Sequence, residues 1–190
     1  MTIDLDELVP EFRTAVGKLL SACEDEGVFM EPYLGSRNPL EQARLWCQSR
    51  TPRQINQEIK NLRSMGADFL ALCIEWAGEQ DGPLVTNVIP GLSWRQWGET
   101  VDCVWIVDGR EEWSSNIRVN GLNGYRIYAQ QAAIHGLTYD EDPKRRNGYG
   151  HVRLRSLSSP LQVYSLEEIN EAMKERFYYL LDGSSNLIQL

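Results

Sequence analysis

The chain has 190 residues and a formal net charge of −8, from 27 acidic and 19 basic side chains. This length suits one domain, or one domain with an appendage, and a hydrophobic content of 42% is enough for a sizeable core rather than a disordered chain. The acidic balance argues against broad binding to nucleic-acid phosphates, which needs a concentrated basic face. We therefore expect a folded domain without a nucleic-acid partner.

The N-terminus and the cysteines bear on the cellular setting. Residues 1–7 are acidic where a secretory signal would be basic, and the apolar runs fall short of the ~18 residues that a membrane-spanning helix needs. We expect cytoplasmic synthesis without a signal peptide, and no membrane partner. The four cysteines lack CxxC spacing and stand in apolar surroundings, which predicts buried, free thiols. They are Cys23, Cys47, Cys73 and Cys103.

The first half of the chain is predicted to be mainly helical. An amphipathic stripe over residues 5–24 predicts the first helix, and residues 28–33 predict a short strand. A proline at a first helical position opens a second helix over about 38–48. A further helical stretch begins at 51–52, breaks near a glycine at 66, and continues through the apolar residues 69–76, which we expect to be well buried.

The second half mixes strands and helices. Residues 101–107 predict a strand buried on both faces, and residues 151–154 a short strand. Residues 123–135 predict a helix, and a capping box at 165–168 opens a last helix that runs to about 181. The apolar stripe of that helix either packs back on the domain or docks on a partner. Helices interleaved with short, non-repeating strands indicate an α+β fold.

The chain contains only two histidines, which limits any catalytic zinc site. Such a site takes three protein ligands, so carboxylates or thiolates would have to join the imidazoles. His135 ends a predicted helix, where a cation suits the helix dipole, so a structural role is expected there. His151 begins a predicted strand and by itself indicates no function.

Several short motifs occur in a fixed order along the chain. They read GSRNPLEQ at 35–42, LWCQSR at 45–50, VTN at 85–87, SWRQWGETVD at 93–102, and a segment that opens with GL at 136 and ends with His151. In this order they resemble the family of D-alanyl-D-alanine carboxypeptidases and phage L-alanyl-D-glutamate endopeptidases, which cut peptidoglycan stem peptides. The family patterns are G-x-R-x-x-x-E-Q, L-x-x-x-G-R, S-x-H-x-x-G-x-A-x-D and a closing D-x-x-H.

The resemblance covers about residues 28–155 and implies a hedgehog/DD-peptidase-like fold, a small antiparallel sheet flanked by helices. It further implies a peptidase-like domain over 1–158, with an inserted helical pair at about 54–80. The insertion would form a wall of the substrate groove or serve as extra scaffold. Residues 159–190 would be a C-terminal helical appendage.

The resemblance also implies a ligand set. In the family, the motif His and Asp and the late His bind one zinc, and a carboxylate three residues before the late His activates the zinc-bound water. Carried over, Asp102 and His151 keep two metal ligands, Arg95 stands at the first ligand position, and Gly148 at the base position. A guanidinium offers no lone pair to a metal, and glycine has no side chain to accept a proton. We therefore expect no intact catalytic residue, and no zinc or weakly bound zinc.

Two alternatives stay open for the metal position. Arg95 could pair with Asp102 and replace the ion by a salt bridge. A shifted carboxylate could instead restore a ligand or a base, although such acids also suit a solvated surface. The candidates are Glu99 in the motif and Asp140, Glu141 and Asp142 in the closing loop.

Two residues are candidates for substrate binding. The resemblance places Arg37 near the substrate, where a planar guanidinium suits a carbonyl or carboxylate, and the alternative is a surface salt bridge. Ser93 would hold the substrate backbone or cap a turn. The tryptophans are expected to be mostly core.

Two functions follow from these residues. The first is a peptidoglycan-peptidase fold without hydrolysis, acting as a cell-wall-binding or structural module. The alternative is an active, endolysin-like zinc peptidase that hydrolyses stem peptides. A wall-directed fold without a secretion signal needs lysis or a delivery machine, which suggests a phage or phage-tail-like particle. The partner would then be a stem peptide, or a phage or tail-assembly protein bound through the C-terminal helix.

Overall fold

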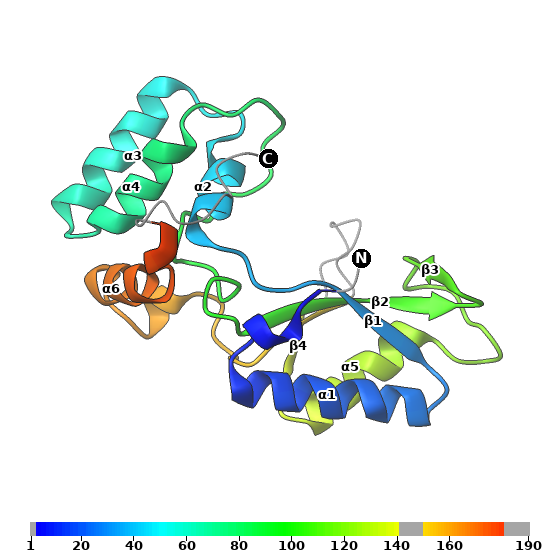
Figure 1. Cartoon of the computed structure of the whole chain (residues 1–190). Helices are drawn as coiled ribbons and strands as arrows, with labels where there is room; N and C mark the ends of the chain where they lie inside the picture. The colour runs from blue at the N-terminus through cyan, green and yellow to red at the C-terminus, as the bar shows by residue number, and fades with distance from the viewer. Residues whose placement is uncertain (1–2, 141–149, 181–190) are drawn as a thin grey trace. The chain divides into compact units, whose positions relative to one another are not determined.

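The computed structural model of the chain describes residues 3–140 and 150–180. The chain forms two compact units, each built from two separate stretches of sequence (Figure 1). We call them the sheet unit, Met1–Ser36 with Trp97–Ser156, and the helical unit, Arg37–Gln96 with Leu157–Leu190. The helical unit contains both the predicted insertion at 54–80 and the segment after residue 159. The predicted division into a peptidase-like domain over 1–158 and a helical appendage over 159–190 stays a prediction.

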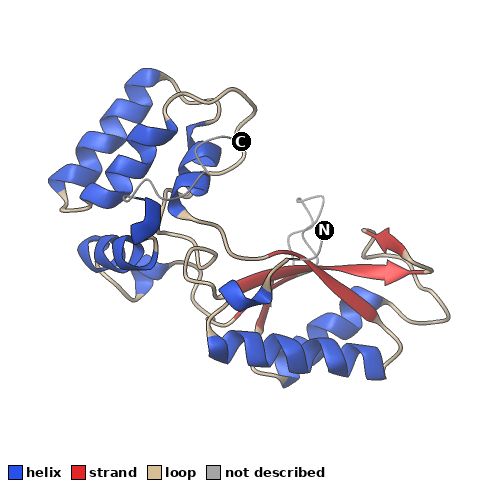
Figure 2. Cartoon of the chain, in the orientation of Figure 1, coloured by secondary structure: helices blue, strands red, loops and turns tan. Residues whose placement is uncertain are grey.

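The described residues of the sheet unit form five strands and the two α-helices α1 and α5. Figure 2 colours the strands red and the helices blue. The strand order is β1-β2-β5-β4, with β3 also paired to β2, and every pairing is antiparallel. The strands are β1 (Phe29–Leu34), β2 (Thr100–Val107), β3 (Arg110–Glu112), β4 (Thr138–Asp140) and β5 (His151–Arg153). Helices α1 (Pro10–Asp25) and α5 (Gly124–Ile134) contact each other and lie along one face of the sheet (Figure 1). The predicted α+β class with a small antiparallel sheet is confirmed.

Alternation along the strands decides which side chains meet the helices. On β2, Val101, Cys103 and Trp105 enter the core that α1 and α5 cover, and on β5 Val152 does the same. Because successive side chains of a strand point to opposite faces, Asp102 and His151 must lie on the face away from α1 and α5. Strand β2 therefore presents the Asp102 carboxylate on the sheet face opposite α1 and α5.

The helical unit is organised around α4 (Asp68–Ala77). This apolar helix contacts α2 (Pro39–Cys47), α3 (Pro52–Ser64) and α6 (Leu166–Arg176). Helices α2, α3 and α6 each begin with a capping box, in which two side chains satisfy the first free backbone amides. The pairs are Asn38 with Glu41, Thr51 with Gln54, and Ser165 with Glu168.

Helix α4 has no cap from its own sequence and receives one from α6. The side chain of Asn170 is 2% exposed, and its Oδ1 accepts hydrogen bonds from the backbone N–H groups of Phe69 at 2.9 Å and Leu70 at 3.2 Å. Beside it, Ile169 and Met173 are fully buried. The apolar stripe of the last helix thus packs inside the helical unit. The sequence had left open whether this stripe packs on the chain itself or docks on a partner.

Several predicted boundaries need correction. The predicted helix over 5–24 begins only at Pro10, which suits a first helical position, and a short 3-10 turn η1 (Leu5–Glu7) precedes it. The last helix ends at Arg176 rather than near 181, followed by a 3-10 turn η3 (Tyr178–Leu180). The expected burial of 69–76 fails at Trp76, which is 45% exposed.

The cysteines are free and buried, as the sequence predicted. Burial raises the pKa of Cys23, Cys73 and Cys103 to about 12 and that of Cys47 to about 11. Each unit contains two of them, so both cores hold neutral thiols at physiological pH. These thiols therefore serve packing rather than metal binding or nucleophilic chemistry.

Candidate functional site

Three polar side chains from three neighbouring strands stand in one row of the sheet. The register pairs Asp102 on β2 with His151 on β5, and His151 with Asp140 on β4. His151 Nδ1 lies 2.5 Å from Asp102 Oδ1, and His151 Nε2 lies 3.8 Å from Asp140 Oδ2. The imidazole therefore stands between two carboxylates, one at each ring nitrogen.

Asp140 also contacts Arg153, which stands two residues after His151 on β5. Arg153 Nη2 donates to Asp140 Oδ1 at 3.0 Å, and Arg153 Nε lies 3.0 Å from Asp140 Oδ2. The Nη2 contact is a hydrogen bond, and the Nε contact is an ion pair with the other carboxylate oxygen. Asp102 is 6% exposed, whereas the Asp140 side chain is 42% exposed, so the two carboxylates lie in very different environments.

The carboxylate of Glu99 is held by a different arginine. Arg155 Nε donates to Glu99 Oε2 at 2.7 Å and Arg155 Nη2 to Glu99 Oε1 at 3.1 Å, while Leu154 N–H donates to the Glu99 backbone carbonyl. Glu99 is 5% exposed, so this two-point contact compensates the burial of its charge. Among the candidate shifted carboxylates, Asp140 rather than Glu99 therefore lies beside His151.

The residue before His151 must be a glycine. A Cβ added at Gly150 would lie 1.7 Å from the backbone oxygen of Cys103, far closer than any real contact. In return, Cys103 N–H donates to the Gly150 carbonyl at 2.9 Å. This close approach of two backbones sets the position of His151 opposite Asp102.

The two predicted substrate-binding residues lie in the helical unit, joined through buried amides. Arg37 Nη1 donates to Gln42 Oε1 at 3.0 Å, and Gln42 Nε2 donates to the Val88 carbonyl at 2.7 Å. Gln96, which is fully buried, donates to the same Gln42 oxygen at 3.3 Å. The Arg37 guanidinium thus donates to a buried amide.

Ser93 connects to this network from the metal motif. Its backbone N–H donates to Gln96 Oε1 at 3.2 Å, and its hydroxyl accepts from the Arg95 N–H at 3.3 Å. Ser93 therefore caps the turn that contains Arg95, and its predicted role toward a substrate stays a prediction. Arg95 itself is 8% exposed.

The structure groups the predicted site residues by unit. Asp102 and His151 meet on the sheet, whereas Arg37, Ser93 and Arg95 belong to the helical unit. Gly148, and with it Glu141 and Asp142, lies outside the described residues.

Sequence reasoning gave little weight to four residues that the structure places at these networks. Asp140 was expected in a loop but stands at the end of strand β4, three residues after Leu137. Nothing in the sequence distinguishes Arg153 from the other arginines as a partner of Asp140. Gln42 and Gln96 stand inside the matched motifs, next to Glu41 and Arg95, so nothing local in the sequence signals their burial. Arg153 contacts Asp140, Gln42 accepts from Arg37, and Gln96 accepts from the Ser93 N–H.

The described donors do not form a three-ligand zinc site. No group of three or more His, Cys, Asp or Glu side chains able to hold a metal occurs within residues 3–140 and 150–180. Asp102 and Asp140 face opposite ring nitrogens of His151, so one ion could contact only one carboxylate together with the ring nitrogen beside it. The described part of the site thus fits a hydrogen-bonded row better than a metal cage.

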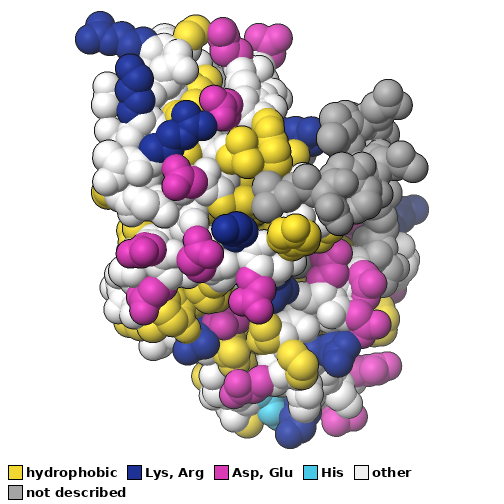
Figure 3. All heavy atoms as spheres, turned by 60° about the vertical axis from the view of Figure 1, so that its left-hand side comes forward, with side chains coloured by type: hydrophobic (Ala, Val, Ile, Leu, Met, Phe, Trp, Pro, Cys, Tyr) yellow, Lys and Arg dark blue, Asp and Glu magenta, His cyan; other side chains and the backbone are white. Residues whose placement is uncertain are grey.

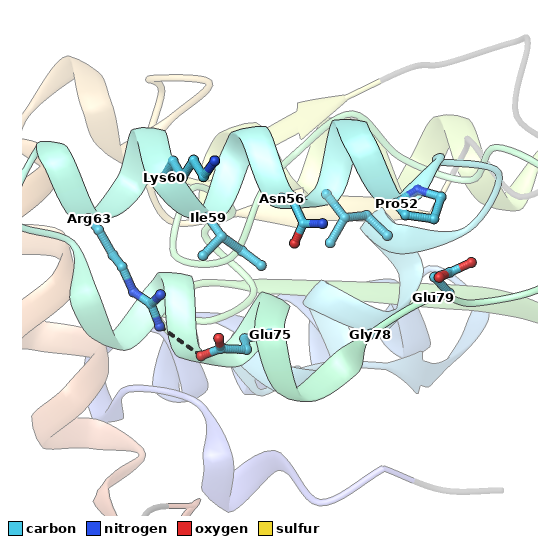
Figure 4. A pocket seen from close by; sticks show the side chains of 9 residues that line it. Pro52, Asn56, Ile59, Lys60, Arg63, Glu75, Gly78 and Glu79 are labelled. Carbon is cyan, nitrogen blue, oxygen red and sulfur yellow. Dashed lines mark hydrogen bonds and ion pairs between the residues drawn. The ribbon is translucent and has the colours of Figure 1, made fainter.

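A hollow of about 290 Å³ lies elsewhere, between α3 and α4, and includes none of the predicted site residues. The buried Ile55 and Ile59 line it, and Figure 4 shows Ile59 on α3 facing α4. Arg63 reaches from α3 to Glu75 on α4, with 2.7 Å between Nη2 and Oε2. The ion pair bridges the two helices across the hollow, which indicates helix packing rather than a ligand site.

On the face shown in Figure 3, basic and acidic side chains are interspersed, with apolar side chains between them. Within the described residues, no helix combines the length and apolar character needed to cross a bilayer.

Comparison with known proteins yields matches only among solved structures. No protein-family model and no curated protein matches the chain. One similar structure is a mutant of the vancomycin resistance D,D-pentapeptidase VanY from the VanB-type cassette in complex with Zn(II), with 16% identity, a TM-score of 0.40, and coverage of 89% of this chain and 83% of that one. Another is VanYB in complex with D-alanine-D-alanine, with 16% identity, a TM-score of 0.41, and coverage of 94% and 84%. At this level the similarity assigns no activity to the present chain.

Proposed function

We propose that the chain is a catalytically inactive relative of peptidoglycan peptidases that acts as a cell-wall-binding or structural module. The observation that supports the proposal is the burial of Arg95, which stands where the resemblance puts the first metal ligand. The two remaining ligand residues, Asp102 and His151, contact each other directly. A row of hydrogen bonds and ion pairs then stabilises the sheet where the family has a metal.

Restoring the missing groups tests this proposal. In the double variant Arg95→His with Gly148→Asp, we expect zinc to bind stoichiometrically, measured by elemental analysis after dialysis, because three donors and a base are again present. The unmodified protein should hold little zinc and release no peptide from purified cell walls. The variant Arg53→His is the matched control, because it changes an exposed arginine of α3 and should gain no zinc.

Wall binding is tested separately from hydrolysis. We expect the unmodified protein to sediment with purified peptidoglycan, and Arg37→Ala to weaken this binding about tenfold, since a charge-assisted hydrogen bond to substrate would be lost. Arg53→Ala should bind like the unmodified protein. Sedimentation that is equally strong after Arg37→Ala would remove Arg37 from the binding surface.

The second candidate function is an active zinc peptidase, and one contact favours it. Asp140 stands in register with His151, with 3.8 Å between Asp140 Oδ2 and His151 Nε2, and could serve as the shifted ligand or base. This candidate requires zinc in the unmodified protein and its loss in Asp140→Asn, together with loss of peptide release. Stoichiometric zinc with measurable hydrolysis in the unmodified protein would replace the first proposal by this one.

The setting we propose is a phage or phage-tail-like particle, with the last helix as the contact to an assembly protein. Because one stripe of α6 packs within the helical unit, the contact would use its exposed residues, such as Glu167 and Glu175. The charge reversals Glu167→Lys and Glu175→Lys should weaken co-assembly without lowering the melting temperature. Co-assembly that survives both reversals would contradict this part of the proposal.

A further inference from the structure

Another cavity lies in the sheet unit, and the charged side chains that line it are basic although the chain as a whole is acidic. It measures about 490 Å³ and is bounded by the loop after β3, the first turn of α5 and Tyr139 of β4. Arg118 from the loop and Arg126 from α5 both line it, and no acidic side chain does so among its described lining residues. The volume falls within the range of about 300–1,000 Å³ that is usual for small-molecule sites.

The walls of this cavity are held in place by a single side chain. Asn123 caps α5, since its Oδ1 accepts from the Arg126 N–H at 2.9 Å. Its Nδ2 donates to the carbonyls of Ser115 at 2.6 Å and Ile117 at 2.9 Å. The loop is therefore fastened to the start of the helix, and Arg118 is positioned relative to Arg126 before any ligand arrives.

A tight turn and an aromatic contact add to this order. Val119 and Leu122 exchange two backbone hydrogen bonds of 2.9 Å around Asn120 and Gly121, whose φ values are +51° and +83°. Positive φ at both central residues is the pattern of the two-residue hairpin turn that favours Asn-Gly. On the opposite wall, the Tyr139 ring packs edge-on against Tyr128, with ring centroids 6.1 Å apart.

The two arginines of the cavity differ from four arginines that pair with carboxylates. Arg13, Arg63, Arg153 and Arg155 each pair with a carboxylate. Arg118 and Arg126 are exposed, and neither side chain makes an ion pair or hydrogen bond with any residue in the described part of the chain. Arg126 also stands in the first turn of α5, where the helix dipole disfavours a cation, so its charge does not serve helix stability.

We propose that this cavity binds a small ligand that carries an oxyanion, either a carboxylate or a phosphate. Two guanidiniums that approach from different segments can each donate paired hydrogen bonds to such a group. The Ser115 and Asn116 side chains on the loop supply further polar contacts for the remainder of the ligand. The site is distinct from the row of Asp102 and His151, and it does not depend on whether that row binds a metal.

The test uses the full chain and two probes, inorganic phosphate and acetate, followed by side-chain and backbone NMR shifts. Sodium chloride at matched ionic strength corrects for screening. We expect saturable shifts at the residues of this cavity, with a Kd of about 1 mM for at least one probe. Saturation by phosphate alone would identify a phosphate ligand, and saturation by acetate a carboxylate ligand.

Variants decide whether the arginines are responsible. Arg118→Gln and Arg126→Gln should each weaken binding about tenfold, because a charge-assisted hydrogen bond is lost. Arg53→Gln, which changes an exposed arginine in the first turn of α3, should bind as the unmodified protein does. Equal melting temperatures show that each variant is folded. Absence of saturation with both probes, or saturation unchanged by both cavity variants, would overturn the proposal.

Discussion

The sheet unit and the helical unit place buried polar side chains for different reasons. In the sheet unit, strand register brings together residues that are far apart in sequence, so Asp102, Asp140 and His151 meet in one row. In the helical unit, a buried polar residue such as Asn170 satisfies the end of a helix. The burial of Asn170 is thus explained by folding alone, whereas the row on the sheet is not required by any helix end and remains a candidate for function.

The largest expected effect comes from the backbone contact that aligns this row. Gly150→Ala should lower the free energy of unfolding by at least about 3 kcal/mol, because the added Cβ would overlap the Cys103 carbonyl and force β5 away from β2. Urea unfolding followed by tryptophan fluorescence measures this loss. Gly17→Ala is the matched control, since nothing lies within 4 Å of its Cβ, and it should be neutral or stabilising by about 0.5–1 kcal/mol. Equal stabilities for the two variants would contradict the close approach.

The next effect concerns the helical unit. Asn170→Ala should cost about 2 kcal/mol, because two buried N–H groups of α4 lose their acceptor. Hydrogen exchange should show the loss first at the amides of Phe69 and Leu70. The control Asn56→Ala removes an exposed amide of α3 and should cost less than about 0.5 kcal/mol. Faster exchange that is confined to the helical unit would show that the two units unfold separately.

The elements of both units could largely be predicted from the sequence, because their signals are local. The capping boxes and the prolines at first helical positions mark where α2, α3 and α6 begin. The apolar run on β2 likewise predicts a buried strand. The end of the last helix could not be placed as well, because the apolar residues after Arg176 continue its stripe but form a 3-10 turn.

The contacts of the candidate site were less predictable, because they depend on register. Asp140 reads as one acid in an acidic loop, and only the pairing of β4 with β5 places it beside His151. Similarly, nothing in the sequence around Asn170 indicates that it caps a helix 100 residues earlier. The motif positions of Asp102 and His151 suggested that the two residues meet, since the resemblance supplied the long-range information that periodicity lacks.

Alkaline pH offers a probe of both cores. The pKa of Cys47 is raised from 9.0 to about 11, so the folded chain keeps a proton that the unfolded chain loses. The stabilisation is complete below pH 9.0 and is lost as pH rises toward 11, by up to about 1.4 kcal/mol per pH unit for each such thiol. Urea unfolding between these pH values should show a fall in stability, and Cys47→Ala should make that fall less steep by one thiol's share. A slope that does not change would mean that this thiol ionises equally in both states.

The smallest effect distinguishes the two carboxylates beside His151. Double-mutant cycles with Asp102→Asn, Asp140→Asn and His151→Gln separate the two pairwise interactions from the other effects of each substitution. The pair of Asp102 and His151 is close and mostly buried, so we expect a coupling of about 1–2 kcal/mol. The pair of Asp140 and His151 is wider and more exposed, so we expect about 0.5 kcal/mol or less. If the second coupling equals or exceeds the first, Asp140 rather than Asp102 is the main partner of the imidazole, and the shifted-carboxylate alternative gains the stronger support.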